Sequence, residues 1–353
     1  MNNKISIPFG EHSLSATVYN HSASARKGCI LYFHGGGLVF GTSDDLPSLY
    51  LNGFRQAGYD FISLSYPLAP ETRLSTILDA AVSSVIYILE HPQVFGYDTM
   101  PPYFLFGRSA GAYLALNVAH RLSTVSCSGA EQHVDAEQLG ITKQHAAADQ
   151  HIVSEQHTTS EHPAITIQAE AAVQPPVAAH RQSGLNQHYP CPAGILSFYG
   201  YHTFDIPEFH KPNPAYLKFP AVPEHVAAQL SGQSFLTEGP KETRYSIYIY
   251  ARQTGKWTDL LGAPEGLAAY SLSEQDLSQL PPCFFTASSS DQDVPFRTSK
   301  YMASKVPGSI FRPVYYLEHD FDRDIRCKEG RKIYEAAIAW MEMQLKIQNN
   351  ILQ

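Results

Sequence analysis

A serine between two glycines gives the clearest chemical signal in this sequence. The motif GRSAG at 107–111 follows an apolar run at 103–107 and directly precedes a helical pattern. In so tight a strand-to-helix turn only glycine fits on either side of the serine, whose hydroxyl is held out on a strained backbone. A bare G-x-S-x-G also occurs by chance, so its position between strand and helix carries the interpretation. The pattern predicts that Ser109 is a nucleophile.

Three consecutive glycines give a second signal. They belong to HGGG at 34–37, directly after the apolar run 29–33. Attack of a hydroxyl on a carbonyl group produces an oxyanion, which needs N–H donors already aimed at it. Glycines supply backbone N–H groups without side chains that block the approach. A simple glycine-rich turn is the alternative, but three glycines in a row are costly to order without a purpose.

An acid and a histidine follow later in the chain. Asp291 comes just after the apolar run 283–287, where an α/β sheet places ligands, and it could fix the tautomer of a catalytic imidazole. Asp293 competes for this role, because a turn rich in Ser and Asp also needs cap residues; we favour Asp291. His319 follows the run 310–317 and is the only histidine downstream of Asp291. We predict that it is a general base rather than an ordinary loop histidine.

The elements that must position these residues alternate along the chain. Helical spacing of apolar residues predicts helices at 74–89, at 109 to about 121 and at 331–347. The short apolar runs lack polar alternation, as expected of central strands covered on both faces. Strands that alternate with helices predict an α/β fold with a mainly parallel sheet between helices. The predicted strands are 13–19, 29–33, 60–66, 103–107, 194–199, 283–287 and 310–317.

Two segments interrupt this alternation. Residues 124–188 contain no Phe, Tyr or Trp, seven of the sixteen histidines, and seven acidic against two basic residues. Such a segment cannot bury enough apolar surface to offset the entropy of ordering it, which predicts a low-complexity, disordered insertion. Residues 201–280, rich in Pro and aromatic residues, are predicted to form a cap or lid over the C-terminal edge of the sheet. The core then comprises 1–123, 189–200 and 281–353.

Composition narrows the choice of partners and compartment. The formal charge is −8 without a basic stretch, so nucleic acid is not expected as a partner. No run approaches the 18 or so apolar residues that span a bilayer. Five scattered cysteines and the lack of an apolar leader favour a cytoplasmic location. The insertion's histidines could suggest a metal, but they sit in Gln-His near-repeats that are better read as low-complexity sequence. We predict no metal, and the oligomeric state cannot be read.

Taken together, HGGG, GRSAG, the late aspartate and the H-x-F at 319–321 resemble the hormone-sensitive-lipase-type branch of α/β-hydrolase esterases. The stretch YPLAPE at 66–71 is similar to the branch's Y-R-L-A-P-E, and the order Ser, Asp, His is that of the fold. The resemblance implies an α/β-hydrolase fold without a cofactor. It makes Ser109 the nucleophile, Asp291 the acid and His319 the base, and it assigns the oxyanion hole to the N–H groups of Gly36, Gly37 and Ala110.

Some features depart from this resemblance. Arg108 stands where the branch usually has Asp, and Pro67 replaces the usual Arg. Asp291 lies 182 residues after Ser109, longer than the family norm, and the 65-residue insertion accounts for the excess. The cap segment, with its TGKW string at 254–257, resembles uncharacterised bacterial α/β-hydrolase-like proteins more than well-studied esterases.

The function that follows is hydrolysis of short- or medium-chain carboxylic esters through an acyl-enzyme. Leu38, Val39 and Trp257 are expected to bound the substrate, although Trp257 could instead anchor the lid. An amidase, peptidase or arylformamidase-like hydrolase would use the same chemistry. A non-catalytic ligand-binding protein on this fold is the alternative from another class; the presence of all three triad residues argues against it.

Overall fold

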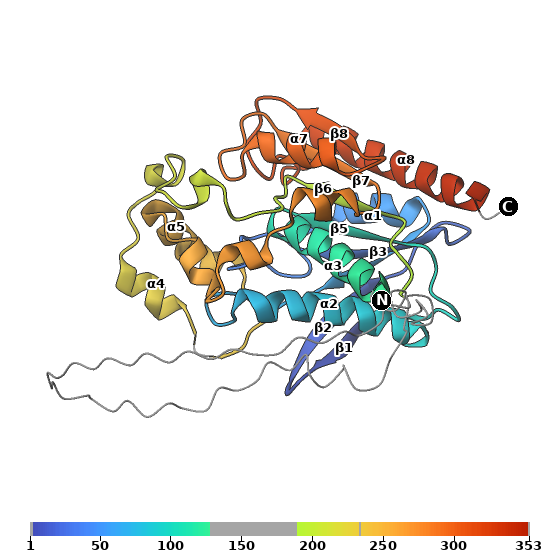
Figure 1. The fold of residues 1–353 in the computed structure, drawn as a ribbon, viewed down its shortest axis with the longest axis horizontal. Helices are drawn as coiled ribbons and strands as arrows, with labels where there is room; N and C mark the ends of the chain where they lie inside the picture. Colours follow the sequence, from blue (N-terminus) through green and yellow to red (C-terminus); the bar gives the residue numbers. More distant parts are fainter. Residues whose placement is uncertain (1–2, 128–188, 233, 352–353) are drawn as a thin grey trace, which may run out of the picture.

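The computed structural model describes residues 3–127, 189–232 and 234–351 (Figure 1). Within them, eight strands form one sheet in the order β1-β2-β4-β3-β5-β6-β7-β8. Pairing is antiparallel between β1 and β2 and between β2 and β4, and parallel from β4 through to β8. The strands are β1 (Asn3–Phe9), β2 (His12–Tyr19), β3 (Gly28–Phe33), β4 (Tyr59–Leu64), β5 (Tyr103–Arg108), β6 (Gly194–Phe198), β7 (Cys283–Ser288) and β8 (Ile310–Val314).

Helices cover both faces of this sheet, which is why the central strands lack polar alternation. Every residue of β3 to β7 is buried. Successive side chains enter two separate cores, as Leu105 and Phe106 of β5 illustrate. One core contains α2 (Leu74–Glu90), α3 (Ala110–Cys127) and α7 (Phe296–Lys305); the other contains α1 (Ser48–Gln56) and α8 (Lys328–Ile351).

The sequence predicted most of these elements. The mainly parallel sheet between helices is confirmed, and α2 ends one residue beyond its predicted limit. Helix α3 extends six residues past the predicted end at Arg121, into 124–127 of the expected insertion, because no Gly or Pro interrupts it there. Strand β1 was not predicted. The rest of the insertion, 128–188, lies outside the described residues.

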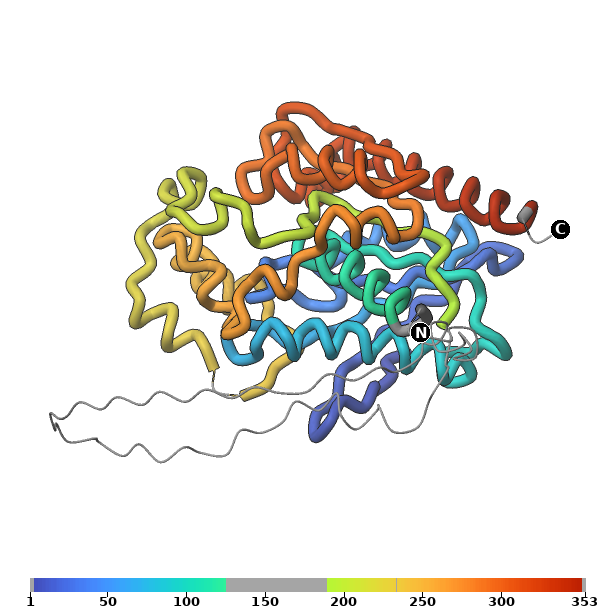
Figure 2. Tube along the Cα trace, viewed as in Figure 1, coloured from blue at the N-terminus to red at the C-terminus, as the bar shows by residue number. Residues whose placement is uncertain are grey.

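Residues 201–280 carry three further helices, α4 (Glu224–Leu230), α5 (Lys241–Thr254) and α6 (Glu274–Ser278). Helices α4 and α5, yellow to orange in Figure 2, lie beyond one end of the sheet. An isolated antiparallel bridge joins Gly41, in the loop after β3, to Gly239, just before α5. The segment therefore lies against a loop at the carboxyl end of a parallel strand, the edge where the fold presents Ser109.

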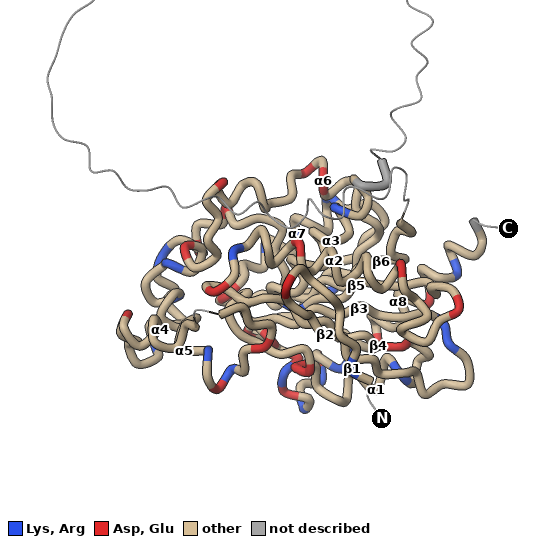
Figure 3. The backbone as a smooth tube through the Cα atoms, turned by 90° about the horizontal axis from the view of Figure 1, so that it is seen from below, with Lys and Arg blue, Asp and Glu red and all other residues tan. Residues whose placement is uncertain are grey.

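Basic and acidic residues lie interspersed over the described part of the chain (Figure 3). Among the helices of that part, none is long and apolar enough to cross a membrane.

Candidate active site

Ser109 occupies the turn between β5 and α3. Its φ is 53°, a left-handed conformation that costs a non-glycine residue energy and is characteristic of functional turns. Its N–H donates to the carbonyl of Phe198 at 2.8 Å, and its carbonyl accepts from Ala112 at 3.0 Å. The strained residue is thus held between β6 and the first turn of α3, with 7% of its surface exposed.

The two glycines of the motif are required by close backbone approach. A Cβ on Gly107 would overlap the backbone of Gly111, and a Cβ on Gly111 would overlap the carbonyl of Phe33 at the end of β3. Both glycines have φ outside the left-handed region, so the constraint at these positions is space rather than conformation. Neither position 107 nor position 111 can therefore carry a side chain in this turn, which is why the motif GRSAG has glycine at both.

His319 joins Ser109 to Asp291. Its Nε2 lies 2.9 Å from the Ser109 Oγ, and its Nδ1 lies 2.7 Å from Asp291 Oδ2. The other carboxylate oxygen of Asp291 accepts the N–H groups of Asp293 at 2.8 Å and Val294 at 2.9 Å. Hydroxyl, imidazole and carboxylate, which come from loops after β5, β8 and β7, thus form one hydrogen-bonded series.

Asp293 lies elsewhere and bonds the cap segment. Its carboxylate accepts the hydroxyls of Tyr216 and Tyr248, each at 2.9 Å, and pairs with Arg252 at 3.3 Å. Of the two aspartates that the sequence left in competition, Asp291 is the one that contacts the imidazole.

The surroundings of His319 favour its protonated form. Burial of the imidazole lowers its pKa, but the charge of Asp291 and its hydrogen bond, together with the charges of Asp293 and Asp320, outweigh burial. They raise the pKa of His319 from 6.5 to about 10. The imidazole can therefore accept the proton of Ser109 only after it has lost its own, which favours alkaline pH.

The glycine triplet lies against the serine turn. A Cβ on Gly35 would lie 3.5 Å from the Cβ of Ser109, and both Gly36 and Gly37 have positive φ, 104° and 60°. In the described part of the chain, the N–H groups of Gly36, Gly37 and Ala110 donate to no other protein group. Free donors beside a nucleophile are the arrangement that an oxyanion requires.

Tyr66, from the YPLAPE stretch, supports this loop. Its hydroxyl donates to the carbonyl of His34 at 2.9 Å and to that of Gly35 at 3.2 Å, and its ring stacks on the His34 imidazole at 4.2 Å. Two motifs that the sequence linked only by resemblance are therefore in direct contact.

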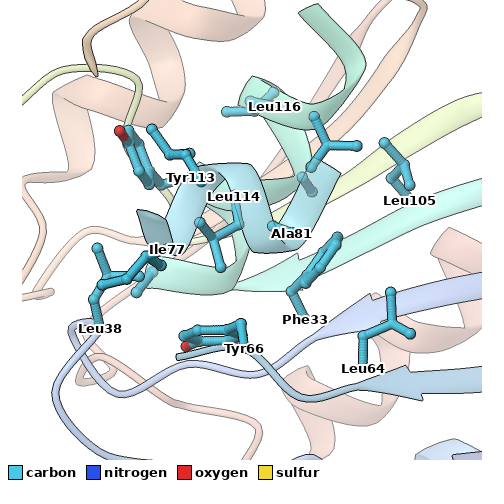
Figure 4. Close-up of a cluster of buried hydrophobic side chains, with 14 of the residues drawn as sticks. Phe33, Leu38, Leu64, Tyr66, Ile77, Ala81, Leu105, Tyr113, Leu114 and Leu116 are labelled. Atoms are coloured by element: carbon cyan, nitrogen blue, oxygen red, sulfur yellow. The ribbon is translucent and has the colours of Figure 1, made fainter. Parts of the chain in front are cut away.

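The three expected substrate contacts are buried in this structure. Leu38 and Val39 have no exposed surface, and Leu38 lies in the same core as Ile77 and Tyr66 (Figure 4). Trp257 is 1% exposed and donates its indole N–H to the carbonyl of Gly37 at 2.9 Å. Its position matches the anchoring alternative, while a role of the three in substrate binding stays a prediction.

A charged cluster around Arg108 was not predicted. Its guanidinium, on a residue 3% exposed, bonds Tyr199, Asp322 and Asp45. The departure from the usual aspartate pointed to an unusual elbow, but these partners lie 91, 214 and 63 positions away. Spacing carries no signal for such contacts.

No group of three or more His, Cys, Asp or Glu side chains that could hold a metal occurs among the residues with described positions. The histidines of the expected insertion lie outside them.

The sheet carries a strained serine, a histidine and an aspartate in the loops after its parallel strands. This combination, with the strand order, identifies the class of protein. Residues 30–182 match the model of a family described as the alpha/beta hydrolase fold. The chain has the α/β-hydrolase fold.

Individual proteins resemble this chain either in fold or in part of its sequence. An alpha/beta hydrolase superfamily protein from Enterococcus faecalis has a TM-score of 0.70 and 26% identity, over 97% of this chain and 99% of that chain. A protein of unknown function from Staphylococcus aureus gives the same TM-score and identity, over 98% and 99%. An ethyl acetate hydrolase from Pseudomonas putida is 34% identical over 115 residues, 32% of this chain and 36% of that protein. The human hormone-sensitive lipase is 30% identical over 112 residues, 32% and 10% of the two chains.

The chain thus spans about a third of the length of the ethyl acetate hydrolase and a tenth of the human lipase. Its likeness to curated esterases is confined to a part of the chain, whereas the likeness in fold covers nearly all of it.

Proposed function

We propose that this protein is a serine hydrolase that cleaves short- or medium-chain carboxylic esters through an acyl-enzyme. The observation that carries the proposal is the hydrogen-bonded series from the hydroxyl of Ser109 through His319 to Asp291, at 2.9 and 2.7 Å. A serine hydroxyl is a weak nucleophile until an adjacent base accepts its proton, and the base acts best when a third group orients it.

In the acylation step, the Oγ of Ser109 attacks the ester carbonyl carbon while its proton passes to Nε2 of His319. The resulting oxyanion accepts hydrogen bonds from the N–H groups of Gly36, Gly37 and Ala110. The C–O bond to the alcohol then breaks, and the imidazolium returns the proton to the leaving oxygen. Asp291 stabilises the imidazolium and keeps Nε2 aimed at the serine.

Deacylation repeats this chemistry with water. His319 accepts a proton from the water as it attacks the acyl carbon, and Ser109 Oγ leaves with that proton, which restores the free enzyme. All the groups required are side chains and backbone donors of this chain, so the proposed reaction needs no cofactor.

The substrate class draws support from the relatives. The names of the ethyl acetate hydrolase and of an acetyl esterase from Salmonella typhi, 27% identical over 112 residues, both indicate small acyl groups. Leu38 and Val39 directly follow the glycine triplet, so the proposal places them near the acyl group. We further propose a cytoplasmic location, supported by the free thiols of Cys29, Cys191, Cys283 and Cys327.

The test is Ser109→Ala, assayed with p-nitrophenyl acetate and with a fluorophosphonate probe. The variant should lose turnover and labelling while its circular dichroism spectrum and melting temperature stay those of the wild type. Wild-type hydrolysis by the variant would refute the assignment. Failure of the wild-type protein to label at Ser109 would favour a ligand-binding protein instead.

A panel of matched p-nitrophenyl esters and p-nitroanilides tests the bond type. Turnover of the esters without measurable turnover of the anilides supports an esterase. Because p-nitrophenyl esters are intrinsically the more reactive substrates, anilide turnover at a comparable rate would make the protein an amidase.

A further inference from the structure

Arg108 is a buried cation immediately before the proposed nucleophile. Its Nε donates to the hydroxyl of Tyr199 at 2.7 Å and pairs with Asp322 at 3.1 Å, and its Nη1 lies 3.4 Å from Asp45. Placing a guanidinium in the interior is unfavourable unless acids and hydrogen bonds compensate for the lost hydration. The chain supplies that compensation at the one residue of β5 that adjoins Ser109.

Asp322 is the main acceptor of this cluster and belongs to the loop of His319. Its side chain is fully buried, and it accepts the hydroxyls of Tyr199 at 2.8 Å and Tyr334 at 2.6 Å in addition to Arg108. Because Asp322 follows His319 by only three residues, its position limits where the imidazole can lie. The ion pair therefore joins the loop that holds the base to the strand that holds the nucleophile.

Tyr199 provides a second connection between Arg108 and the imidazole. Its ring packs edge-on against His319, with centroids 4.7 Å apart at 64°, while its hydroxyl contacts both Arg108 and Asp322. The residue has φ of 41°, a strained conformation for a bulky side chain. Strain of this kind persists where the surroundings over-determine the backbone. Here the surroundings fix the ring of Tyr199, which packs against the imidazole of His319.

We propose that Arg108 is a positioning residue for the proposed hydrolysis. Through Asp322 and Tyr199 it holds the imidazole of His319 within hydrogen-bonding distance of Ser109, without touching the substrate itself. This inference rests on the proposed function. It also explains how this elbow accommodates Arg108 in place of the aspartate usual in the esterase branch that the sequence resembles: the balancing carboxylates come from Asp322 and Asp45.

The test is Arg108→Gln, with Arg108→Lys as the conservative variant. Loss of the ion pair lets the base drift, and a misplacement of about 1 Å costs up to roughly 100-fold in rate. We expect kcat and the rate of fluorophosphonate labelling to fall together by about 10- to 100-fold, with KM changed less than about threefold, because ester binding is untouched. Arg108→Lys should recover part of kcat.

The pH dependence separates positioning of the base from general loosening. Arg108→Gln leaves the Asp322 carboxylate without its cation, which favours the imidazolium and shifts the rise of kcat/KM to higher pH. Asp322→Asn leaves the Arg108 cation without its carboxylate, which disfavours the imidazolium and shifts the rise of kcat/KM to lower pH. If Arg108 and Asp322 had only a structural role, both substitutions would lower activity, but they would not shift the pH profile in opposite directions.

Arg121→Gln is the matched control, because it breaks another arginine–carboxylate pair, with Asp79 at 2.8 Å, between α2 and α3. It should leave kcat and the pH profile unchanged. If Arg108→Gln does not fold, Arg108→Lys and Tyr199→Phe, which keeps the ring but removes the hydroxyl, carry the same readouts.

The inference is overturned if folded Arg108 variants keep wild-type kcat, or lose it with an unmoved pH profile and no recovery by lysine. An inactive wild-type protein that fails to label would instead refute the proposed function, so the two failures are distinguishable.

Discussion

Trp257 donates its indole N–H to the carbonyl oxygen of Gly37 at 2.9 Å, across 220 positions of the chain. The bond fixes the peptide after Gly37, in the loop whose N–H groups we propose as oxyanion donors. The ring of Tyr248, another residue of the cap segment, occupies the space where a Cβ on Gly37 would lie. Residues of segment 201–280 thus pack directly against the glycine triplet and fix the peptide that follows Gly37.

Trp257→Phe should slow the reaction without weakening substrate binding. Phenylalanine keeps aromatic packing against Tyr201 and Phe209 but cannot donate to Gly37. Loss of a direct oxyanion donor costs about 100- to 1,000-fold, and an indirect support should cost less, about tenfold in kcat. Steady-state kinetics with p-nitrophenyl acetate measure this. Trp340→Phe is the control, because the Trp340 indole N–H has no partner among the described residues; equal losses in both variants would contradict the role of the hydrogen bond.

The activity should rise with pH into the alkaline range. His319 must be neutral to accept the proton of Ser109, and its pKa is raised to about 10, so protonation removes the base as the pH falls below that value. A profile of kcat/KM, corrected for spontaneous hydrolysis, measures the rise. A limb centred near 6.5, the usual pKa of histidine, would contradict the effect of the surrounding carboxylates.

Asp291→Asn tests the cause of that shift. Removing the carboxylate removes the largest influence that raises the pKa of His319, so the limb should move to lower pH. The amide can also hold the imidazole in the wrong tautomer, which costs on the order of 10⁴-fold in kcat. Asp293→Asn is the comparison, because Asp293 bonds the cap segment instead of the imidazole. A larger loss in Asp293→Asn would mean that the acid is misassigned.

Local patterns were sufficient to predict the parts of the site that depend on a single turn. Ser109 and the glycines beside it are specified by close backbone approach within a few residues, and His319 by its place after the last strand. The sequence favoured Asp291 without excluding Asp293, because both lie in one turn and either could reach the edge of the sheet. Spacing alone says nothing about which carboxylate faces an imidazole.

Contacts between distant segments could not be predicted, since each depends on the assembled sheet. The sequence showed that Arg108 was unusual, but only the neighbouring ends of β5 and β6, with the loop after β8, bring Tyr199 and Asp322 to it. Strand β1 was missed for a related reason. Its outward positions are exposed at the edge of the sheet, so Asn3–Phe9 lacks the continuous apolar run of the central strands.

The elbow glycines should be far less replaceable than a glycine inside a helix. Gly111→Ala places a Cβ on the carbonyl of Phe33, which cannot move without distorting β3. We expect a loss of about 3 kcal/mol or more in the free energy of unfolding, measured with urea. Gly53→Ala is the control: in α1 its Cβ would meet only Ile338 at 3.8 Å, and it should stabilise by about 0.5–1 kcal/mol. Similar effects of the two substitutions would refute the packing argument.

The ion pair of Arg244 and Glu71 should contribute more to the free energy of unfolding than its distances alone indicate. Both Glu71 oxygens accept from the Arg244 guanidinium, at 2.8 and 2.7 Å, and the same group donates to the carbonyls of Val39 and Ala69. Side-chain exposure is 7% for Arg244 and none for Glu71. Arg244→Met leaves a buried carboxylate unpaired, so the free energy of unfolding should fall by about 3–5 kcal/mol.

Arg297 and Glu208 provide the matched comparison. They form the same two-pronged pair, at 2.9 and 2.6 Å, but their side chains are 61% and 36% exposed. Water can solvate either charge after Arg297→Met, so the loss should stay below about 1 kcal/mol. Urea unfolding of both variants measures the difference. Arg244→Met should also reduce kcat, because the guanidinium holds the carbonyl of Val39 two residues after Gly37; a stable and fully active Arg244 variant would show that this link between cap and loop is dispensable.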